Sequence, residues 1–243
     1  MIITMNSGMV LRFKAAGWHF LFSALLLVGL VLWLWWWAYP AGLFWVQGAD
    51  RVLLIMALVH LVIGPGLVFA VFKKGKRSLP YDVALITALQ CVAFGYGSWV
   101  LYQERPAGLV LTLDRFFVVT ETKVPTDTLE DRAALDSGAG SVFWAYAGLP
   151  LALSQTDQAI IRSATRAPAL ARQPGRYLAF AQAQSQLARQ ALTPERAAAF
   201  CGCTIPASVD YHLLPVVGKA RRGIALVDAQ AVQLERIIAG QPH

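Results

Sequence analysis

Charged residues are scarce in this chain. They make up 14% of its 243 residues, whereas hydrophobic residues make up 57%. This composition is more apolar than that of an ordinary soluble domain. The formal net charge is +7. Where the cations lie matters more than their number, because cations clustered beside apolar runs act differently from a basic face.

The sequence also lacks the motifs by which many enzymes are recognised. It contains no Gly-x-Ser-x-Gly, Ser-x-x-Lys, His-Glu-x-x-His or phosphate-binding loop, and its four histidines do not cluster. We therefore predict no catalytic, cofactor-binding or metal-binding residue, and we expect that the protein is not an enzyme.

Cysteine is rare, with three residues in the chain. Cys91 lies in an apolar run, where packing is its simplest role. An oxidising compartment would permit a disulfide between Cys201 and Cys203. Four interpretations of this pair stay open: a local structural clip, two simple thiols, a redox-active pair, and a weaker metal site that lacks further ligands nearby.

Three apolar segments occupy the first part of the chain, at about 18–38, 52–72 and 83–102. Each has roughly 20 residues, the length that a helix needs to cross a hydrocarbon core about 30 Å thick. The sequence therefore predicts a three-helix transmembrane domain over residues 18–104, with an N-terminal segment 1–17 and a connecting loop 73–82.

The cations predict the orientation of these helices. Six of them lie in the N-terminal segment and the second connection: Arg12, Lys14, Lys73, Lys74, Lys76 and Arg77. The connection between the first two helices, from Tyr39 to Arg51, contains one cation, Arg51. The positive-inside rule places the N-terminus and the loop 73–82 in the cytoplasm and residues 105–243 on the far side, the periplasm of a Gram-negative bacterium. Contact of the basic loop with anionic lipid is compatible with this topology, whereas nucleic-acid binding is not expected.

Aromatic residues gather where the first helix ends and in the connection that follows. They are Trp33, Trp35, Trp36, Trp37, Tyr39, Phe44 and Trp45. Tryptophan and tyrosine favour the membrane–water interface because their rings are apolar and their polar hydrogens need water. We interpret the group as an interfacial belt; the alternative is a surface for a partner helix.

Residues 105–243 have an ordinary soluble composition, with 14 Lys and Arg against 11 Asp and Glu. We predict a mixed α+β domain. One buried strand is expected over 109–120, and a loop entering a short strand over 142–153. Helices are expected at 126–135, 154–165 and 182–191, and another is expected to begin at Thr193-Pro194-Glu195. Three apolar runs, 209–217, 223–228 and 231–239, are separated by short turns and predict an antiparallel β-meander.

The second apolar segment is interrupted by His60 and by Gly64-Pro65-Gly66. Pro65 removes a backbone donor, so we predict a kink there, and the flanking glycines would let another helix approach closely. An ionisable residue inside a membrane helix is costly and often faces a partner. His60 is either such a contact or a neutral ring hydrogen-bonded to a neighbouring helix.

An ordered series of short matches runs through the chain: Gly64-Pro65, Val71-Phe72-Lys73-Lys74-Gly75-Lys76, Asp82, Gln90, Tyr96-Gly97, Arg105-Pro106 and Asp114-Arg115-Phe116, followed by Leu213–Gly218 and Leu226-Val227-Asp228. In this series the sequence resembles the type IV pilin accessory protein family, the TfpX/TfpZ group. Two positions depart from the family pattern. His60 stands where the family usually has an aspartate, and the chain ends Pro242-His243 where the family tends to end in Pro-Trp.

The resemblance implies an inner-membrane accessory protein, a chaperone or assembly factor that binds the cognate major type IV pilin and promotes its stability or its assembly into pili. Other pilus assembly proteins are further candidate partners, beside the lipid bilayer itself. Partner-binding residues are expected among His60, Gly64, Pro65, Gly66, Tyr96, Gly97, Arg105, Asp114 and Arg115. The alternative function is a membrane-anchored envelope sensor or scaffold with a ligand-binding periplasmic domain, which the short cytoplasmic segments disfavour.

Overall fold

The computed structural model describes residues 7–40, 42–73, 75–123, 136–137, 142–147, 171, 177–206, 210–230 and 233–242. These residues form two compact units. The helical unit contains the chain up to Trp33 and Ala49–Tyr102, and the sheet unit contains Leu34–Gly48 and the chain from Gln103 on. The division differs from the boundary expected near residue 104, because Leu34–Gly48 belongs to the sheet unit.

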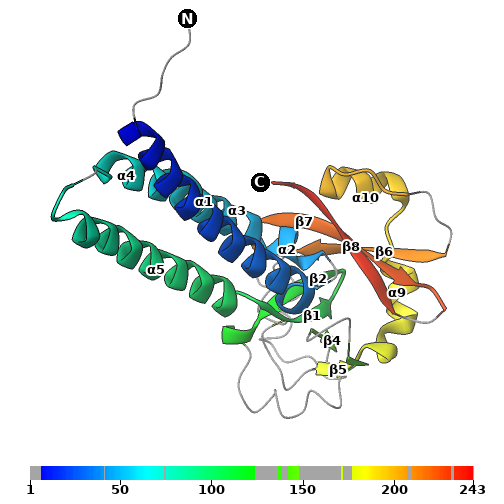
Figure 1. Cartoon of the computed structure of the whole chain (residues 1–243). Coiled ribbons are helices and arrows are strands. Elements are labelled where there is room, and N and C mark those ends of the chain that lie inside the picture. The colour runs from blue at the N-terminus through cyan, green and yellow to red at the C-terminus, as the bar shows by residue number, and fades with distance from the viewer. Residues whose placement is uncertain are drawn as a thin grey trace, which may run out of the picture. The chain divides into compact units, whose positions relative to one another are not determined.

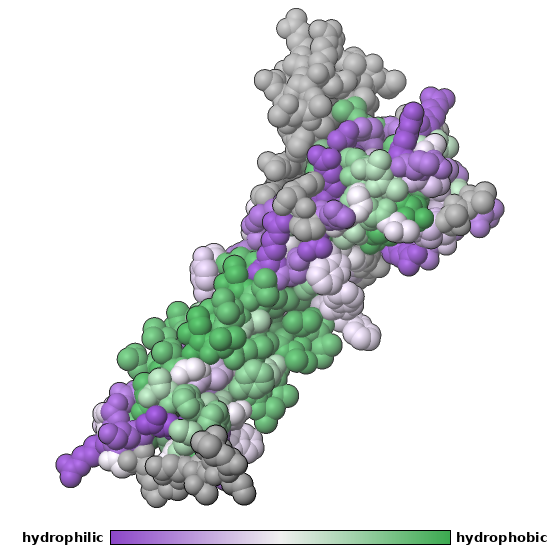
Figure 2. Space-filling view, turned by 90° about the horizontal axis from the view of Figure 1, so that it is seen from above, coloured by the Kyte–Doolittle hydropathy of each residue, from purple (hydrophilic) through white to green (hydrophobic). Residues whose placement is uncertain are grey.

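The helical unit contains the three long apolar helices that the sequence predicts (Figure 1). They are α1 (Ser7–Trp33), a continuous helix formed by α3 (Ala49–Ala57), the π-helix η2 (Leu58–Ile63) and α4 (Gly64–Val71), and α5 (Leu79–Gln103). The segments Gly8–Ala38, Ala49–Val71 and Leu79–Gln103 are long and apolar enough to cross a membrane. Figure 2 shows hydrophobic side chains gathered over these helices.

All three long helices begin before the predicted bounds, the second at Ala49 instead of residue 52. The first begins at Ser7 rather than near residue 18, so Arg12 and Lys14 lie on its early turns. The third begins at Leu79, with Pro80 in its first turn, where a missing N–H costs nothing. Lys76 of the preceding loop forms an ion pair with Asp82, at 2.5 Å between Nζ and Oδ2.

The interruption at Pro65 takes the form of a change in hydrogen bonding. The helix is π-helical over Leu58–Ile63, and the N–H of Gly64 donates to the carbonyl of Val59, five residues back. Proline has no N–H to donate to the preceding turn, and a local π-helical adjustment can satisfy the backbone groups that a proline leaves free in an apolar helix. The helix continues through Gly64-Pro65-Gly66 as far as Val71.

The sheet unit is built on an eight-stranded mixed sheet. Its path is β3 (Asp136–Ser137), β4 (Phe143–Ala147), β1 (Pro106–Thr112), β2 (Arg115–Thr120), β6 (Tyr211–Val217), β7 (Arg221–Asp228) and β8 (Leu234–Pro242), with β5 (Tyr177–Ala179) paired to β4. β1 pairs with β4, and β2 with β6, in parallel; the other pairs are antiparallel. The predicted C-terminal meander is confirmed as β6–β7–β8.

The single strand expected over 109–120 is wrong: this segment is part of a hairpin. Thr112 of β1 pairs with Arg115 of β2, which leaves Leu113 and Asp114 as a two-residue turn. Leu113 has φ of +37°, outside the range that leucine normally adopts. Leucine is not a typical turn residue, so the apolar run gives no indication in the sequence that the chain reverses direction here.

Both faces of the sheet are buried, because successive side chains along a strand point to opposite faces. On one face Ala225 and Val227 of β7 join a large core with Leu187 and Phe180. On the other face Ile224 and Leu226 pack under α10 (Pro194–Cys201). Helices therefore cover both faces of the β6–β7–β8 region.

The connection between the first two long helices is part of the sheet unit's core. It contains the π-helix η1 (Leu34–Ala38) and the short helix α2 (Leu43–Gln47). Leu43 and Val46 are fully buried among core residues from β1, β2, β6 and β7. From the sequence we expected residues 34–38 to end the first membrane helix and residues 39–48 to lie in an aromatic-rich loop, so this part of the core was missed.

The remaining predictions for the sheet unit are partly tested. The expected helix at 182–191 is present as the 3-10 turn η7 (Phe180–Ala183) followed by α9 (Gln184–Gln190). The helix start at Thr193 is confirmed, since the Thr193 hydroxyl accepts a hydrogen bond from the N–H of Arg196 at 3.4 Å. The helices expected at 126–135 and 154–165 lie outside the described residues, as does the end of segment 142–153.

Candidate functional site: a polar cluster among apolar helices

Three polar side chains meet inside the helical unit, one from each long helix. Nε2 of His19 on α1 bonds to Oε1 of Gln90 on α5. Nε2 of Gln90 donates to the carbonyl of Val59 at 3.4 Å, and Nε2 of His60 lies 3.2 Å from the backbone carbonyl of Gln90. Gln90 therefore links α1 to the π-helical segment of the second helix.

His60 is buried at 3% exposure, with both ring nitrogens facing carbonyl oxygens. Nδ1 lies 2.8 Å from the carbonyl of Met56, on its own helix, and Nε2 faces Gln90 of α5. Phe94 packs edge-on against the ring at 5.6 Å between centroids. Carbonyl oxygens only accept, so a neutral imidazole with one N–H donates to one of the two, and the Met56 contact is the shorter. The ring thus has a contact within its own helix and one with α5, and a role of His60 in binding a partner stays a prediction.

The π-segment supplies the acceptor that Gln90 uses. The carbonyl of Val59 receives both the N–H of Gly64 and the side-chain amide of Gln90. Pro65 follows Gly64 directly and is half-buried. The interruption and the polar cluster therefore meet at one group, because the Val59 carbonyl accepts a hydrogen bond from the π-turn and a second one from α5.

Two glycines make room for these contacts. A Cβ on Gly64 would overlap the side-chain amide of Gln90, and a Cβ on Gly97 would lie 2.5 Å from the sulfur of Met56. Both positions therefore permit close approach of α5 to the second helix. Gly66 does not serve this purpose, because nothing lies within 4 Å of its added Cβ.

The other predicted partner-binding residues lie apart from the cluster. Tyr96 is 66% exposed on α5, with its ring 6.0 Å from that of Trp99. In the sheet unit Arg105 pairs with Glu121 at 3.7 Å, beside the start of β1. Asp114 and Arg115 lie at the opposite end of the β1–β2 hairpin, at its turn.

The hairpin turn carries its own ion pair. Nε and Nη2 of Arg115 donate to the two carboxylate oxygens of Asp114 at 2.8 and 2.5 Å. These hydrogen bonds lower the pKa of the Asp114 carboxyl, against a smaller opposing effect of burial. The pair is satisfied locally and half-exposed.

A buried tyrosine, Tyr39, lies near the charged residues Glu104 and Arg105 of the sheet unit. Burial, and secondarily the charge of Glu104, raise the pKa of the Tyr39 hydroxyl well above its usual range, against the lowering influence of Arg105. Glu104 pairs with Lys219 of the β6–β7 turn at 3.0 Å. Sequence reasoning missed this grouping because its members are far apart along the chain.

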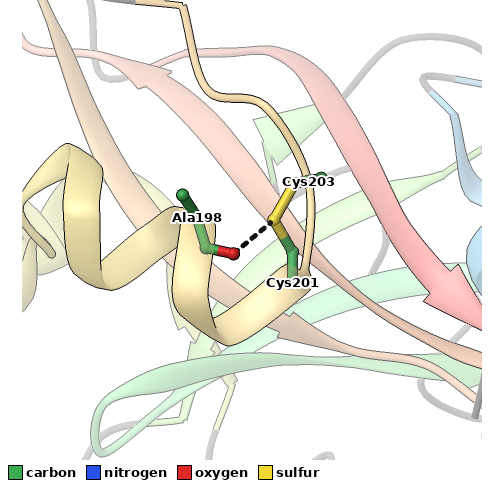
Figure 3. The surroundings of a disulfide bond; sticks show 3 residues. All are labelled: Ala198, Cys201 and Cys203. Carbon is green, nitrogen blue, oxygen red and sulfur yellow. Dashed lines mark hydrogen bonds between the residues drawn. A yellow bond between two sulfur atoms is a disulfide. The ribbon is translucent and has the colours of Figure 1, made fainter.

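Cys201 and Cys203 form a disulfide at the end of α10 (Figure 3). Sγ of Cys201 also lies 3.8 Å from the carbonyl oxygen of Ala198, a contact that becomes a hydrogen bond only in the thiol form. Cys201 is buried against Leu213, Ile224 and Leu226. Cys91 is exposed on α5 with a free thiol.

His19 and Gln90 were not predicted from the sequence as members of a site. A signal existed for Gln90, since an uncharged polar residue in an apolar helix needs a hydrogen-bond partner and Gln90 belonged to the series of matches. His19 gave only the same general signal, and no sequence spacing relates residue 19 to residue 90.

The structure thus defines a protein with three long apolar helices joined by a polar cluster and followed by a mixed sheet unit. No family model and no solved structure matches the chain. Among known proteins it is similar to "Fimbrial assembly protein, serogroup I" of Dichelobacter nodosus, at 32% identity over 121 residues, which is 48% of this chain and 46% of that protein. The serogroup E1 protein of the same organism matches at 31% identity, over 46% of its length.

A third protein, "Fimbrial assembly protein, serogroups C1 and C2" of Dichelobacter nodosus, is 31% identical over 121 residues, and the match covers 90% of its length. The chain therefore belongs to the family of these fimbrial assembly proteins. It spans about half the length of the first two relatives. The narrower assignment to the TfpX/TfpZ group stays a prediction.

Proposed function

We propose that this protein is an inner-membrane assembly factor of the type IV pilus. The observation that carries the proposal is its similarity to fimbrial assembly proteins, supported by three helices long enough to cross a membrane. The positive-inside rule then assigns the N-terminus and the loop 73–82 to the cytoplasm and the sheet unit to the periplasm.

We further propose that the assembly factor binds the major pilin through the exposed face of α5. Large side chains recur there at alternating intervals of four and three residues: Leu85, Leu89, Val92, Tyr96 and Trp99, all exposed. This is the spacing of a helix-packing seam. Gly95 lies beside the series, with nothing within 4 Å of an added Cβ. An apolar helix face with a small residue beside it suits close packing of one partner helix.

The first test is genetic. Deletion of the gene should reduce surface pili without changing pilin transcription, as measured by counting pili in electron micrographs and by quantifying pilin messenger RNA. Normal pilus numbers in the deletion strain would contradict a role in assembly.

The second test addresses the α5 face. Gly95→Phe should reduce several-fold the amount of pilin that co-purifies with the tagged protein from membranes, because a ring would fill the space proposed for the partner helix. Gly29→Phe is the matched control, since Gly29 of α1 is equally open around its added Cβ. An equal loss of co-purified pilin in both variants would indicate a general effect of the bulky side chain. Pilin retained at the wild-type level in both variants would exclude the α5 face as the pilin-binding site. Both variants must reach wild-type levels in the membrane.

The cysteine pair provides a separate prediction. We expect the double substitution Cys201→Ser with Cys203→Ser to leave pilus numbers unchanged, because the disulfide joins residues two apart and closes only a small loop. The measurement is pilus counting in the deletion strain carrying the variant. Loss of pili at normal protein levels would instead support a redox role for the pair.

A further inference from the structure

The segment Leu34–Gly48 presents two different surfaces. Its inward side chains are buried in the sheet unit: Leu34, Leu43 and Val46 are all at 0% exposure. Its outward side chains are four tryptophans, Trp35, Trp36, Trp37 and Trp45, all exposed, with Trp36 reaching 84%. Large exposed indoles in this density are unusual on a soluble surface.

The inward surface is fixed firmly to the sheet. The N–H of Ala220 in the β6–β7 turn donates to the carbonyl of Val46 at 3.1 Å, and the N–H of Lys219 donates to Oε1 of Gln47 at 3.0 Å. Gly42 has φ of +85° and lies so close to the Ile237 carbonyl that a Cβ there would approach its oxygen to 2.5 Å. The segment is therefore an integral part of the sheet unit and not a flexible tether.

The outward surface is organised around aromatic contacts. Trp35 packs against Phe44 and Trp45, with centroids 5.6 and 6.3 Å apart. The guanidinium of Arg221 lies over the ring of Trp45, 5.5 Å from its centroid. The combination of exposed indoles with a cation at their margin is the chemistry of a membrane–water interface, where the ring is apolar and the polar groups remain hydrated.

Very few residues separate this surface from the apolar helices along the chain. Residues Leu34–Ala38 complete the apolar segment Gly8–Ala38, and Gly48 alone separates α2 from α3. The third helix ends at Gln103 and β1 begins at Pro106. Wherever the helices leave the hydrocarbon, the sheet unit begins within a few residues.

We infer that the surface formed by Trp35, Trp36, Trp37 and Trp45 lies in the phospholipid headgroup region of the bilayer, so that the sheet unit rests directly on the membrane. The inference assumes that the helices span the membrane, as proposed above. The occupant of the surface is lipid, because its residues are covalently continuous with segments of membrane-spanning length and composition.

Spin-label accessibility tests this assignment in the full chain. The background is Cys91→Ala, which removes the free thiol, and labels are placed one at a time by Trp36→Cys, Leu25→Cys and Arg196→Cys. Leu25 is exposed in the middle of the apolar part of α1, and Arg196 is exposed on α10. Each protein is reconstituted into nanodiscs of phosphatidylethanolamine and phosphatidylglycerol. Collision with oxygen, which concentrates in lipid, is compared with collision with a water-soluble nickel chelate.

We expect the label at position 36 to show an oxygen-to-nickel ratio between those at 25 and 196, with a mobile spectrum. A ratio equal to that at 196 would overturn the inference while leaving the membrane-spanning proposal intact. An immobile label that neither oxygen nor the nickel chelate reaches would mean that protein covers the surface. This result would also overturn the inference. A water-like ratio at position 25 would instead contradict the membrane-spanning proposal itself. The Cys91→Ala protein alone should remain unlabelled.

Discussion

Replacing Leu43 by alanine should destabilise the sheet unit by about 2–5 kcal/mol, although residue 43 precedes the domain expected from the sequence by some sixty residues. Leu43 is fully buried in the large core beside Val46 and Ile237. Removing its branched side chain loses transfer free energy and leaves a cavity. Since domains are stable by only about 5–15 kcal/mol, this is a large fraction of the total.

The measurement is urea-dependent proteolysis of the full chain in detergent micelles, followed through a C-terminal tag. Leu43→Ala should lower the urea concentration at which the sheet unit becomes cleavable. The control is Trp36→Ala in the same segment, whose side chain is exposed and should leave the midpoint unchanged in detergent. Identical midpoints for wild type and Leu43→Ala would show that the segment is not part of the core.

Replacing Gly64 by alanine should weaken the helical unit by about 1–3 kcal/mol, which corresponds to a few hydrogen bonds between membrane helices. The new methyl group occupies the position of the Gln90 amide. Gln90 would have to move and would lose its bonds to the Val59 carbonyl and to His19. The unfolding of the helices by increasing mole fractions of dodecyl sulfate, followed by circular dichroism, measures the loss.

The matched control is Gly66→Ala, two residues further along the same helix. Nothing lies within 4 Å of its added Cβ, and alanine is the better helix former, so stability should be unchanged or slightly higher. A double-mutant cycle makes the test specific. In a Gln90→Ala background, Gly64→Ala should cost nothing further, because the amide that it displaces is gone. If Gly64→Ala lowers stability as much in the Gln90→Ala background as in the wild type, the loss does not come from displacing the Gln90 amide.

The parts of the fold that could be predicted from the sequence depend on local patterns. The three apolar segments were long enough to identify as helices, although their ends shifted by several residues because polar residues continue a helix without an apolar signal. The meander β6–β7–β8 was visible because short turns separate its apolar runs. The hairpin at Leu113-Asp114 was not, because leucine at a positive φ carries no turn signature.

The parts that could not be predicted depend on distant contacts. His60 and Gly64 were singled out as unusual, but their partner Gln90 became evident only when the helices were placed side by side. The role of Leu34–Gly48 was hidden for a different reason. Its tryptophans fitted an interfacial belt, while Leu43 and Val46 resembled ordinary loop residues until the sheet provided a core for them. Tyr39 and Phe44, expected in the same belt, are buried in the sheet unit.

The contact between Gln47 and Lys219 joins residues 172 positions apart in the chain. During synthesis from the N-terminus, Leu43 and Val46 emerge before any strand of the sheet exists, and β8 emerges last. Most of the chain must therefore be made before this core can close, a topology of high contact order that folds slowly. If the helices span the membrane as proposed above, segment 34–48 can reach the sheet only from the side of the membrane on which the sheet folds. A chain whose first helix pair had inserted in the wrong orientation would then keep Leu43 and Val46 on the opposite side, and its sheet unit would remain incomplete. Under that proposal, completion of the sheet unit depends on correct insertion of the helices that precede it.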